Sequence, residues 1–112
     1  MERRRFQLDL APNSEFRFRL LANNSEPILA SEGYSSKQAC SNGIVSVKKN
    51  ALDETKFEKL ERGSNYYFNL KAGNGEVIGI SEMYTSASAR DNGIKSVMTN
   101  APIAEVEDLT VA

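Results

Sequence analysis

The sequence predicts an α+β fold: tandem β-β-β-α repeats with pseudo-twofold symmetry, an antiparallel sheet with two helices packed on one face, and a C-terminal strand. Three observations predict it. The chain repeats itself at a spacing of fifty residues, each copy contains strands with apolar residues at every second position, and each copy ends with apolar residues at helical spacing. We therefore expect residues 1–112 to form a single compact domain, with 5–53 as repeat one and 56–109 as repeat two.

The duplication aligns residues 16–51 with residues 66–101 without a gap, and about half of the aligned positions are identical. The clearest pair is NGIVSVKKNA, which ends at Ala51, and NGIKSVMTNA, which ends at Ala101. Upstream, RFQLDL matches KFEKLE, with a shift of one residue in the turn that follows. One such unit alone would have a marginal core, so the two copies are expected to pack on each other.

The first strand of each copy is RFQLDL or KFEKLE, and the second, EFRFRLLA or YYFNLKA, has period two with aromatic residues on the inner side. The turns ANNSE and AGNGE follow, and Asn-Gly predicts a two-residue hairpin turn with both central φ values positive. The third strand is PILASE or VIGISE. Because Pro27 has no N–H, it should lie at the start of its strand or on an exposed edge.

A helix is expected next, within YSSKQACSNGIVSVKKNA, because small and apolar residues recur there at steps of three and four. Those residues are Ala39, Cys40, Gly43, Ile44 and Val47. Glycine inside a helix costs about 1 kcal/mol against alanine. Its use at the same phase in both copies, at Gly43 and Gly93, predicts that each helix lies too close to the sheet to admit a side chain.

The helix ends are predicted from capping residues. Ser35 is the expected N-cap, Gln38 completes a capping box, and Tyr34 packs against the first buried turn. Thr85, Ser88 and Tyr84 repeat this arrangement in the second copy. Asn50 and Asn100 are expected in the left-handed conformation that ends a helix. After the second helix, AEVEDLTV is expected to add a last strand to the sheet.

Composition excludes several kinds of chemistry. The chain has 112 residues, a net charge of −1, no histidine, no tryptophan and one cysteine. Catalysis by a histidine base and zinc sites with histidine ligands are therefore excluded, and no metal or other cofactor is expected. A single cysteine, the lack of a membrane-spanning apolar run and the lack of a secretory signal favour a cytoplasmic protein without membrane contact.

The two ends of the chain carry opposite charge. Arg3, Arg4 and Arg5 crowd the N-terminus, whereas the segment after Ala101 carries only acidic charged residues: Glu105, Glu107 and Asp108. The sequence interpretation of both segments is that they are solvated ends.

The repeated motifs F-x-F-x-L-x-A-x-N-x-E-x-I, S-E-x-Y-S-S and N-G-I-x-S-V-x-x-N, twice in tandem, resemble the YegP-like family of small bacterial proteins. The resemblance covers almost the whole chain. It implies a duplicated β-β-β-α unit that forms one sheet, with an exchange of strands between the halves, and single-repeat relatives that pair as homodimers would be its counterpart. It implies no catalytic residues, because the family is uncharacterised.

The S-E-x-Y string is the best candidate site, since it lies at both junctions between strand and helix. Its residues are Ser31, Glu32, Tyr34, Ser81, Glu82 and Tyr84. If Glu32 and Glu82 approached each other, repulsion could raise one pKa and create an acid–base pair. The structural alternative, which we favour, is that the tyrosines pack under the helices and the carboxylates complement the helix N-termini.

The outward side of the second strands is another candidate, because Arg17, Arg19 and Tyr67 together are typical of a platform for single-stranded nucleic acid. Only one aromatic residue faces outward and the net charge is slightly negative, so a solvated face is the preferred interpretation. Cys40 lacks a histidine partner, and Arg90 takes its place in the second copy. It is therefore expected to be a buried apolar residue rather than a nucleophile.

The function that the sequence favours is a small non-enzymatic binding or protein-interaction module, which would bind a peptide on the open sheet face or along an edge strand. The partner is expected to be a protein or peptide, and the chain is expected to be a monomer with pseudo-dimeric repeats. Two alternatives stay open. One is a nucleic-acid-associated protein that uses the open sheet face, although nucleic acid is the less favoured partner, and the other is an enzyme that uses Glu32 and Glu82.

Overall fold

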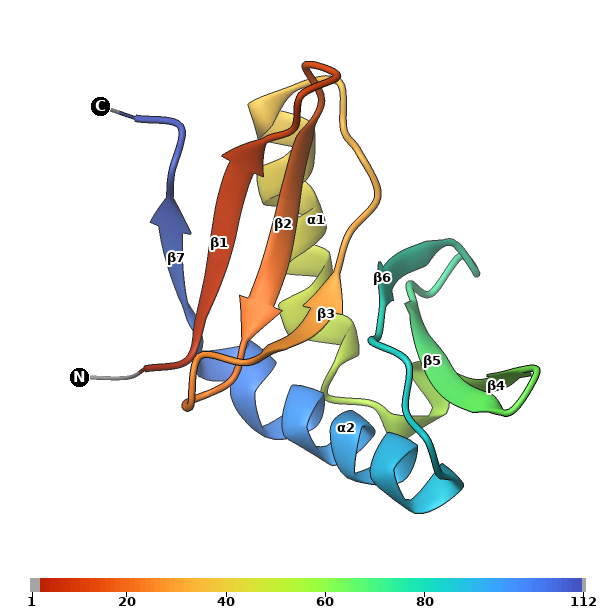
Figure 1. Cartoon of the computed structure of the whole chain (residues 1–112). Helices are drawn as coiled ribbons and strands as arrows, with labels where there is room; N and C mark the ends of the chain where they lie inside the picture. The colour runs from red at the N-terminus through yellow and green to blue at the C-terminus, as the bar shows by residue number, and fades with distance from the viewer. Residues whose placement is uncertain (1–2, 112) are drawn as a thin grey trace.

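A computed structural model describes residues 3–111 of the chain, so residues 1, 2 and 112 of the expected domain lie outside it (Figure 1). The first half contains β1 (Arg5–Leu10), β2 (Phe16–Leu21), β3 (Pro27–Ala30) and α1 (Lys37–Asn50). After the short helix η1 (Glu54–Lys56), the second half contains β4 (Phe57–Arg62), β5 (Asn65–Lys71), β6 (Val77–Ile80) and α2 (Ala87–Asn100). A second short helix, η2 (Ala101–Ile103), leads to β7 (Glu105–Asp108). The predicted order of elements is therefore confirmed.

The strands form one sheet in the order β4-β5-β6-β3-β2-β1-β7. All neighbours are antiparallel except β1 and β7, which are parallel, so the sheet is mixed and the expectation of a wholly antiparallel sheet is wrong at this edge. The reason is the route of the chain. β7 follows α2 and crosses to the first half, so no hairpin forces it to run against β1.

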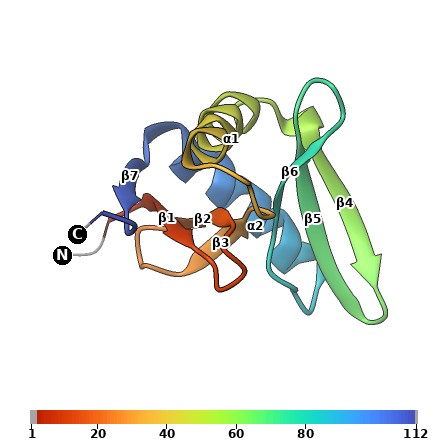
Figure 2. The ribbon, with the colours of Figure 1, turned by 90° about the horizontal axis from the view of Figure 1, so that it is seen from above.

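The two halves of the sheet meet at β3 and β6, which share only the pair Ala30 and Ile80. Seen from above, the two groups of strands are steeply inclined to each other, and α1 lies in the angle between them (Figure 2). Each helix contacts strands from both halves: α1 contacts β1, β2, β5 and β6, and α2 contacts β3 and β5. The helices therefore hold together a sheet that is narrowly joined at its centre.

One side of the sheet carries the core, and both helices pack there. Phe6 and Phe18 meet edge to face with ring centroids 5.8 Å apart, and their counterparts Phe57 and Phe68 do the same at 5.6 Å. The buried residues of α1 are Cys40, Gly43, Ile44 and Val47, and those of α2 are Gly93, Ile94, Val97 and Asn100. The inner sides of the strands and the helix faces thus match the predicted pattern, except that Ala39 is only partly buried.

The predicted turn type is wrong. In AGNGE, Gly75 has a φ of 87° and no other residue of the turn has positive φ, so the loop has three residues instead of two. The Gly75 N–H donates to the Ala72 carbonyl, and the Asn74 side chain accepts the Glu76 N–H at 3.0 Å. The asparagine therefore bonds forward to the backbone instead of adopting the left-handed conformation itself.

The same turn occurs three times. In AGNGE the Ala72 N–H also donates to the Glu76 carbonyl. ANNSE and APNSE repeat both backbone bonds and the asparagine bond, with Ser25 and Ser14 in the place of Gly75. Both serines have positive φ, 67° and 70°. APNSE joins β1 to β2, whereas the two residues Gly63 and Ser64 join β4 to β5. This difference is the shift of one residue that the sequence alignment required.

The helix caps differ from the predicted ones by one residue. Ser36 and Ser86 are the N-caps, and their hydroxyls accept the backbone N–H groups of Ala39 and Ala89 at 3.0 Å. The predicted caps Ser35 and Thr85 lie one residue too early. The error arises because two adjacent residues, each a serine or threonine, could accept the capping hydrogen bond equally well.

The helix C-termini are also different from the prediction. Asn50 and Asn100 are the last helical residues and are not left-handed, and Asn100 has a φ of −91°. Each side chain donates to the carbonyl and hydroxyl oxygens of the serine one turn earlier, Ser46 or Ser96. The chain then continues as a turn through the fully buried Ala51 and Ala101.

The repeated helix glycines have the close contact that the sequence predicted, but the neighbour is a side chain of the S-E-x-Y string. A Cβ on Gly43 would lie 2.4 Å from Tyr34 Oη and 3.1 Å from a ring carbon of Phe18. A Cβ on Gly93 would lie 2.4 Å from Tyr84 Oη. Each tyrosine ring therefore occupies the space that a side chain on the helix glycine would need.

Candidate functional site: the two edges of the sheet

The sheet has two edges, which would be equivalent if the duplication were exact. In the part of the chain that the structure describes, one edge is covered by a further strand and the other is not. In the first half, β7 covers β1, and Phe6 and Leu8 lie opposite Val106 and Asp108. In the second half, β4 is the outermost strand of the sheet, and the residues that the structure describes place no strand beside it. The edge of β4 is thus the counterpart of an edge that is filled within the same chain.

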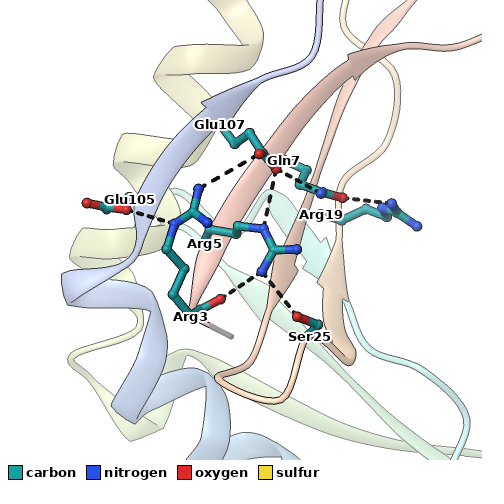
Figure 3. A network of polar contacts seen from close by, with 7 residues as sticks. All are labelled: Arg3, Arg5, Gln7, Arg19, Ser25, Glu105 and Glu107. Atoms are coloured by element: carbon teal, nitrogen blue, oxygen red, sulfur yellow. Dashed lines mark hydrogen bonds and ion pairs between the residues drawn. The ribbon is translucent and has the colours of Figure 1, made fainter. Parts of the chain in front are cut away.

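Charged side chains fix β7 to β1 (Figure 3). Arg3 Nε lies 3.0 Å from Glu105 Oε2, and Arg5 Nε lies 3.3 Å from Glu107 Oε1. Gln7 donates to the same Glu107 oxygen at 2.9 Å. The interpretation of both termini as solvated ends is therefore wrong, since the basic segment and the acidic segment bind each other across the β1–β7 pair. The opposite charges of the two segments were the sequence signal for this contact.

The geometry of β5 shows which groups of β4 face the free edge. Phe68 directs both backbone groups towards the β6 side, because its N–H donates to Ser81 Oγ and its carbonyl accepts the Ser81 N–H. In an antiparallel ladder such groups alternate in direction, so Tyr67 bonds to its β4 partner Leu60. The neighbours of Leu60, Lys59 and Glu61, must then point their N–H and carbonyl groups away from β5, towards the free edge.

The edge of β7 is less suited to accept another strand. β7 has four residues against six in β4, and three of the four are acidic. Short edges that carry charge are a common protection against further pairing. β4 carries both charges and a half-buried Leu60, so it is the longer and less protected edge of the two.

The outward side of the sheet, which contains Arg17, Arg19 and Tyr67, is balanced in charge. Arg17 Nε lies 2.9 Å from Asp9 Oδ1, and Arg19 donates to Gln7 at 2.9 Å. Lys71 lies 3.1 Å from Glu58, and Tyr67 lies under the guanidinium of Arg62 at 5.7 Å. The cations of this face therefore have partners within the protein, and binding of nucleic acid here stays a prediction with reduced physical support.

The S-E-x-Y residues have clear roles in folding. Ser31 Oγ accepts the Phe18 N–H at 2.9 Å and donates to the Glu32 carbonyl at 2.8 Å, and Ser81 makes the equivalent two bonds. The hydroxyl continues the β2–β3 or β5–β6 ladder at the point where the strand ends. The string therefore directs the chain from the sheet to the helix.

The tyrosines of the string lie between sheet and helix. Tyr34 forms two backbone bonds with Phe16, and its ring stacks on Phe18 with centroids 6.2 Å apart. Tyr84 stacks on Phe68 in the same way at 6.5 Å. Burial raises the pKa of both phenols, and the carboxylates of Glu32 and Glu82 add to the effect. These phenols stay protonated at neutral pH and act as packing groups.

Glu32 and Glu82 themselves are exposed to solvent. No described contact joins either carboxylate to a cation or to the other carboxylate. Catalytic acids and bases usually lie in enclosed pockets, and these two carboxylates lie on the surface. A binding role for these residues stays a prediction, and the acid–base hypothesis gains no support from their surroundings.

Cys40 is fully buried, and burial raises the pKa of its thiol to about 11. We expect native protein at pH 8 to react with a thiol reagent only at the rate at which it unfolds, because the thiolate is both rare and inaccessible. The measurement is the rate of labelling with and without denaturant. Rapid labelling of the native protein, at the rate of a small free thiol, would show that the cysteine is accessible.

The carboxylates of β7 predict a loss of stability in acid. Hydrogen bonds from Thr110 and the ammonium of Lys37 lower the pKa of Asp108 to about 2, and the bond from Gln7 lowers that of Glu107. An aspartate with an unfolded pKa of about 3.9 then stabilises the fold above that pH and loses the effect as pH falls towards 2. We expect Asp108→Ala to lower the urea midpoint at pH 7 and to have little effect near pH 2.

Equal loss of stability by Asp108→Ala at both pH values would contradict this account of β7. Leu109→Ala serves as a matched control, because its side chain is half exposed and does not titrate. Its effect on the urea midpoint should not depend on pH in this range.

Within residues 3–111 no group of three or more acidic or cysteine side chains is placed to hold a metal ion. Among the helices described, none is long and apolar enough to cross a membrane.

Comparison with known proteins agrees with the fold and the duplication. The family model described as a domain of unknown function, DUF1508, matches twice, at residues 11–58 and 62–108. A "UPF0339 protein in ptx operon 5'region" of Stutzerimonas stutzeri is 57% identical over 51 residues, which are 46% of each chain. The UPF0339 protein YegP of Escherichia coli O157:H7 is 46% identical over 54 residues, which are 48% of this chain and 49% of that protein. These matches span about half the length of the relatives concerned.

Solved structures match over nearly the whole chain. The solution structure of yegP from E. coli, described as a protein of unknown function, has a TM-score of 0.92 and 41% identity, and the match covers 100% of this chain and 97% of that one. The structure of a UPF0339 protein of Shewanella oneidensis has a TM-score of 0.90 and 45% identity, with 96% and 92% covered. The predicted YegP-like resemblance is confirmed, and none of these descriptions assigns an activity.

Proposed function

The chain belongs to the family of the domain of unknown function DUF1508, and from this premise we propose that it is a non-enzymatic module that binds an extended peptide of a partner protein along β4. The partner strand would receive backbone hydrogen bonds from Lys59 and Glu61. It would thereby extend the sheet beyond β4, as β7 extends it beyond β1.

The observation that supports this proposal most strongly is the parallel pairing of β7 with β1. The Leu8 carbonyl accepts a hydrogen bond from the Leu109 N–H at 2.8 Å, and Leu109 belongs to the separate segment that follows α2. The counterpart of Leu8 in the second half is Lys59. The first edge therefore gives a working example of the interaction that we propose for the second. Main-chain bonds supply affinity in such complexes, and side chains beside the strand supply specificity.

The outer side of β4 suggests what the peptide would present. Leu60 and its cross-strand neighbour Tyr67 are both half buried, and they lie on the outer side of the sheet between Glu58 and Arg62. An apolar side chain next to Leu60, with charged residues before and after it, would complement this surface. We therefore expect peptides with alternating apolar and charged residues to bind best.

The catalytic alternative has less support than peptide binding, since Glu32 and Glu82 are exposed and the relatives carry no assigned catalytic role. The proposal also includes a cytoplasmic location, which the single buried, unpaired Cys40 supports.

The test is an NMR titration of the isotope-labelled protein with a pool of extended peptides that alternate apolar and charged residues. We expect the largest amide shifts at Lys59 and Glu61. Glu61→Pro should abolish binding because it removes an N–H that faces the free edge, and the matched variant Glu61→Ala should retain binding because it keeps that N–H. Shifts confined to other elements, or equal binding by the proline variant, would contradict the proposal.

A further inference from the structure

A cleft between the two repeats was not among the sites that the sequence suggested. It has a volume of about 520 Å³ and lies between the second half of α1 and the turn that joins β5 to β6. Its walls therefore come from both repeats. Clefts of this size are typical of sites for small molecules.

The lining of this cleft is rich in hydrogen-bond donors. Lys49 and Lys56 contribute ammonium groups, Asn42 and Asn74 contribute amides, and Gly73 contributes the backbone of the turn. None of the residues that line the cleft is acidic. A lining with two cations and no carboxylate favours a negatively charged ligand.

The donors are not used by the protein itself. Asn74 Oδ1 accepts the Glu76 N–H and Asn42 Oδ1 accepts from Gln38, so both amide NH₂ groups remain available. The turn bonds Gly75 back to Ala72 and leaves the N–H groups of its two central residues, Gly73 and Asn74, unbonded.

The two lysines are also unpaired. Four of the five other lysines have partners: Lys37, Lys59 and Lys71 lie within 4.0 Å of carboxylates, and Lys48 lies over the Phe6 ring. Within residues 3–111, neither Lys49 nor Lys56 forms an ion pair. Two cations without internal partners thus face one cleft, and they come from α1 and from the short helix that follows it.

We propose that this cleft binds a small organic anion that carries a phosphate or carboxylate group. The anion would lie between Lys49 and Lys56, with the turn amides of Gly73 and Asn74 as further donors. Val45 and Ala72 give the cleft an apolar part for the carbon skeleton of the ligand. The C-terminal dipole of α1 opposes an anion, but by less than two charge-assisted hydrogen bonds contribute.

The duplication provides an internal comparison. At the offset of fifty residues Lys49 corresponds to Thr99, and in the matched strings KFEKLE and RFQLDL Lys56 corresponds to Arg5. Arg5 is paired with Glu107 at 3.3 Å, so neither equivalent position in the other repeat holds an unpaired cation. Val45 corresponds to Lys95, which is exposed and has no carboxylate partner among the described residues. Two cations without ion-pair partners thus occur at these positions on one side of the pseudo-twofold axis only. Lys95 is a matched control for a lone exposed lysine on the other helix.

The test is an NMR titration of the isotope-labelled full chain at constant ionic strength with three probes: inorganic phosphate, glycerol phosphate and succinate. We expect saturable shifts at Asn42, Lys49, Gly73 and Asn74. The double variant Lys49→Gln/Lys56→Gln should bind about tenfold more weakly or worse, which corresponds to the loss of roughly 1.4 kcal/mol, and Lys95→Gln should bind as the wild type does.

The three probes distinguish the chemical group. Saturation by the phosphate probes alone would identify a phosphate site, saturation by succinate alone a carboxylate site, and saturation by both a site that selects charge. The proposal fails if none of the probes saturates or if the double variant binds as tightly as the wild type. It does not depend on peptide binding at β4, because the two experiments report on different amides.

Discussion

Gly43→Leu is expected to destabilise the folded protein by about 3 kcal/mol, and Gly93→Leu by a similar amount. The new Cβ would lie 2.4 Å from the hydroxyl of Tyr34 or Tyr84, and the rest of the side chain would have to displace the ring. The ring cannot move easily, because it stacks on Phe18 or Phe68 and the tyrosine backbone is bonded to β2 or β5. Urea unfolding measures the loss.

Gly73→Leu is the matched control for these substitutions. It makes the same change at a glycine whose Cβ would have no neighbour within 4 Å, and the φ of Gly73 is not positive. We expect its urea midpoint to stay close to that of the wild type. If Gly43→Leu were as stable as this control, the tyrosine ring would not be the constraint that excludes a side chain from the helix.

Gly79→Leu is expected to destabilise the protein by about 2–3 kcal/mol, because it fills the narrow junction between the two halves. A Cβ on Gly79 would lie 2.6 Å from Leu29 Cδ2. At the offset of fifty residues, Leu29 and Gly79 are counterparts, so one copy places a large side chain at the pseudo-twofold axis and the other makes room for it. Calorimetry or urea unfolding measures the effect.

The exchange of the two residues tests this explanation. Leu29→Gly alone should be strongly destabilising, because Leu29 is fully buried and its loss leaves a cavity. The double variant Leu29→Gly/Gly79→Leu restores one leucine and one glycine at the axis, so it should be more stable than either single variant. Additive losses in the double variant would mean that the two residues do not share one space.

The order of elements could be predicted because each signal is local. Alternating residues around Phe18 and Phe68 define strands, and the steps from Cys40 to Val47 define a helix, without knowledge of any distant contact. The duplication doubled each signal, since a pattern seldom occurs twice at one phase by chance. The inference that Gly43 lies against a close neighbour had the same origin.

The neighbour itself could not be predicted in this way. Tyr34 and Gly43 are both repeated, but their contact depends on how the chain between them returns the helix over the sheet. The sequence interpretation therefore placed the tyrosine at the first turn of the helix, whereas its hydroxyl lies at the middle. Side-chain contacts between elements depend on tertiary geometry, which periodicity alone does not contain.

The same limit explains the errors at the termini and the missed cleft. Arg5 and Glu107 lie at opposite ends of the chain, and only the parallel pairing of β1 with β7 brings them together. Lys49 and Gly73 line one cleft although they belong to different repeats. The charge asymmetry of the ends was visible in the sequence, but the assumption that charged termini are solvated outweighed it.

The most direct test of the proposed open edge is hydrogen exchange at two equivalent amides, those of Leu8 and Lys59. Leu8 faces β7 and should be strongly protected, whereas Lys59 faces the free edge and should exchange at nearly the rate of an unstructured amide. Addition of a bound peptide should then protect Lys59 and leave Leu8 unchanged. Protection of Lys59 equal to that of Leu8 in the free protein would contradict the claim that β4 is open to a partner strand.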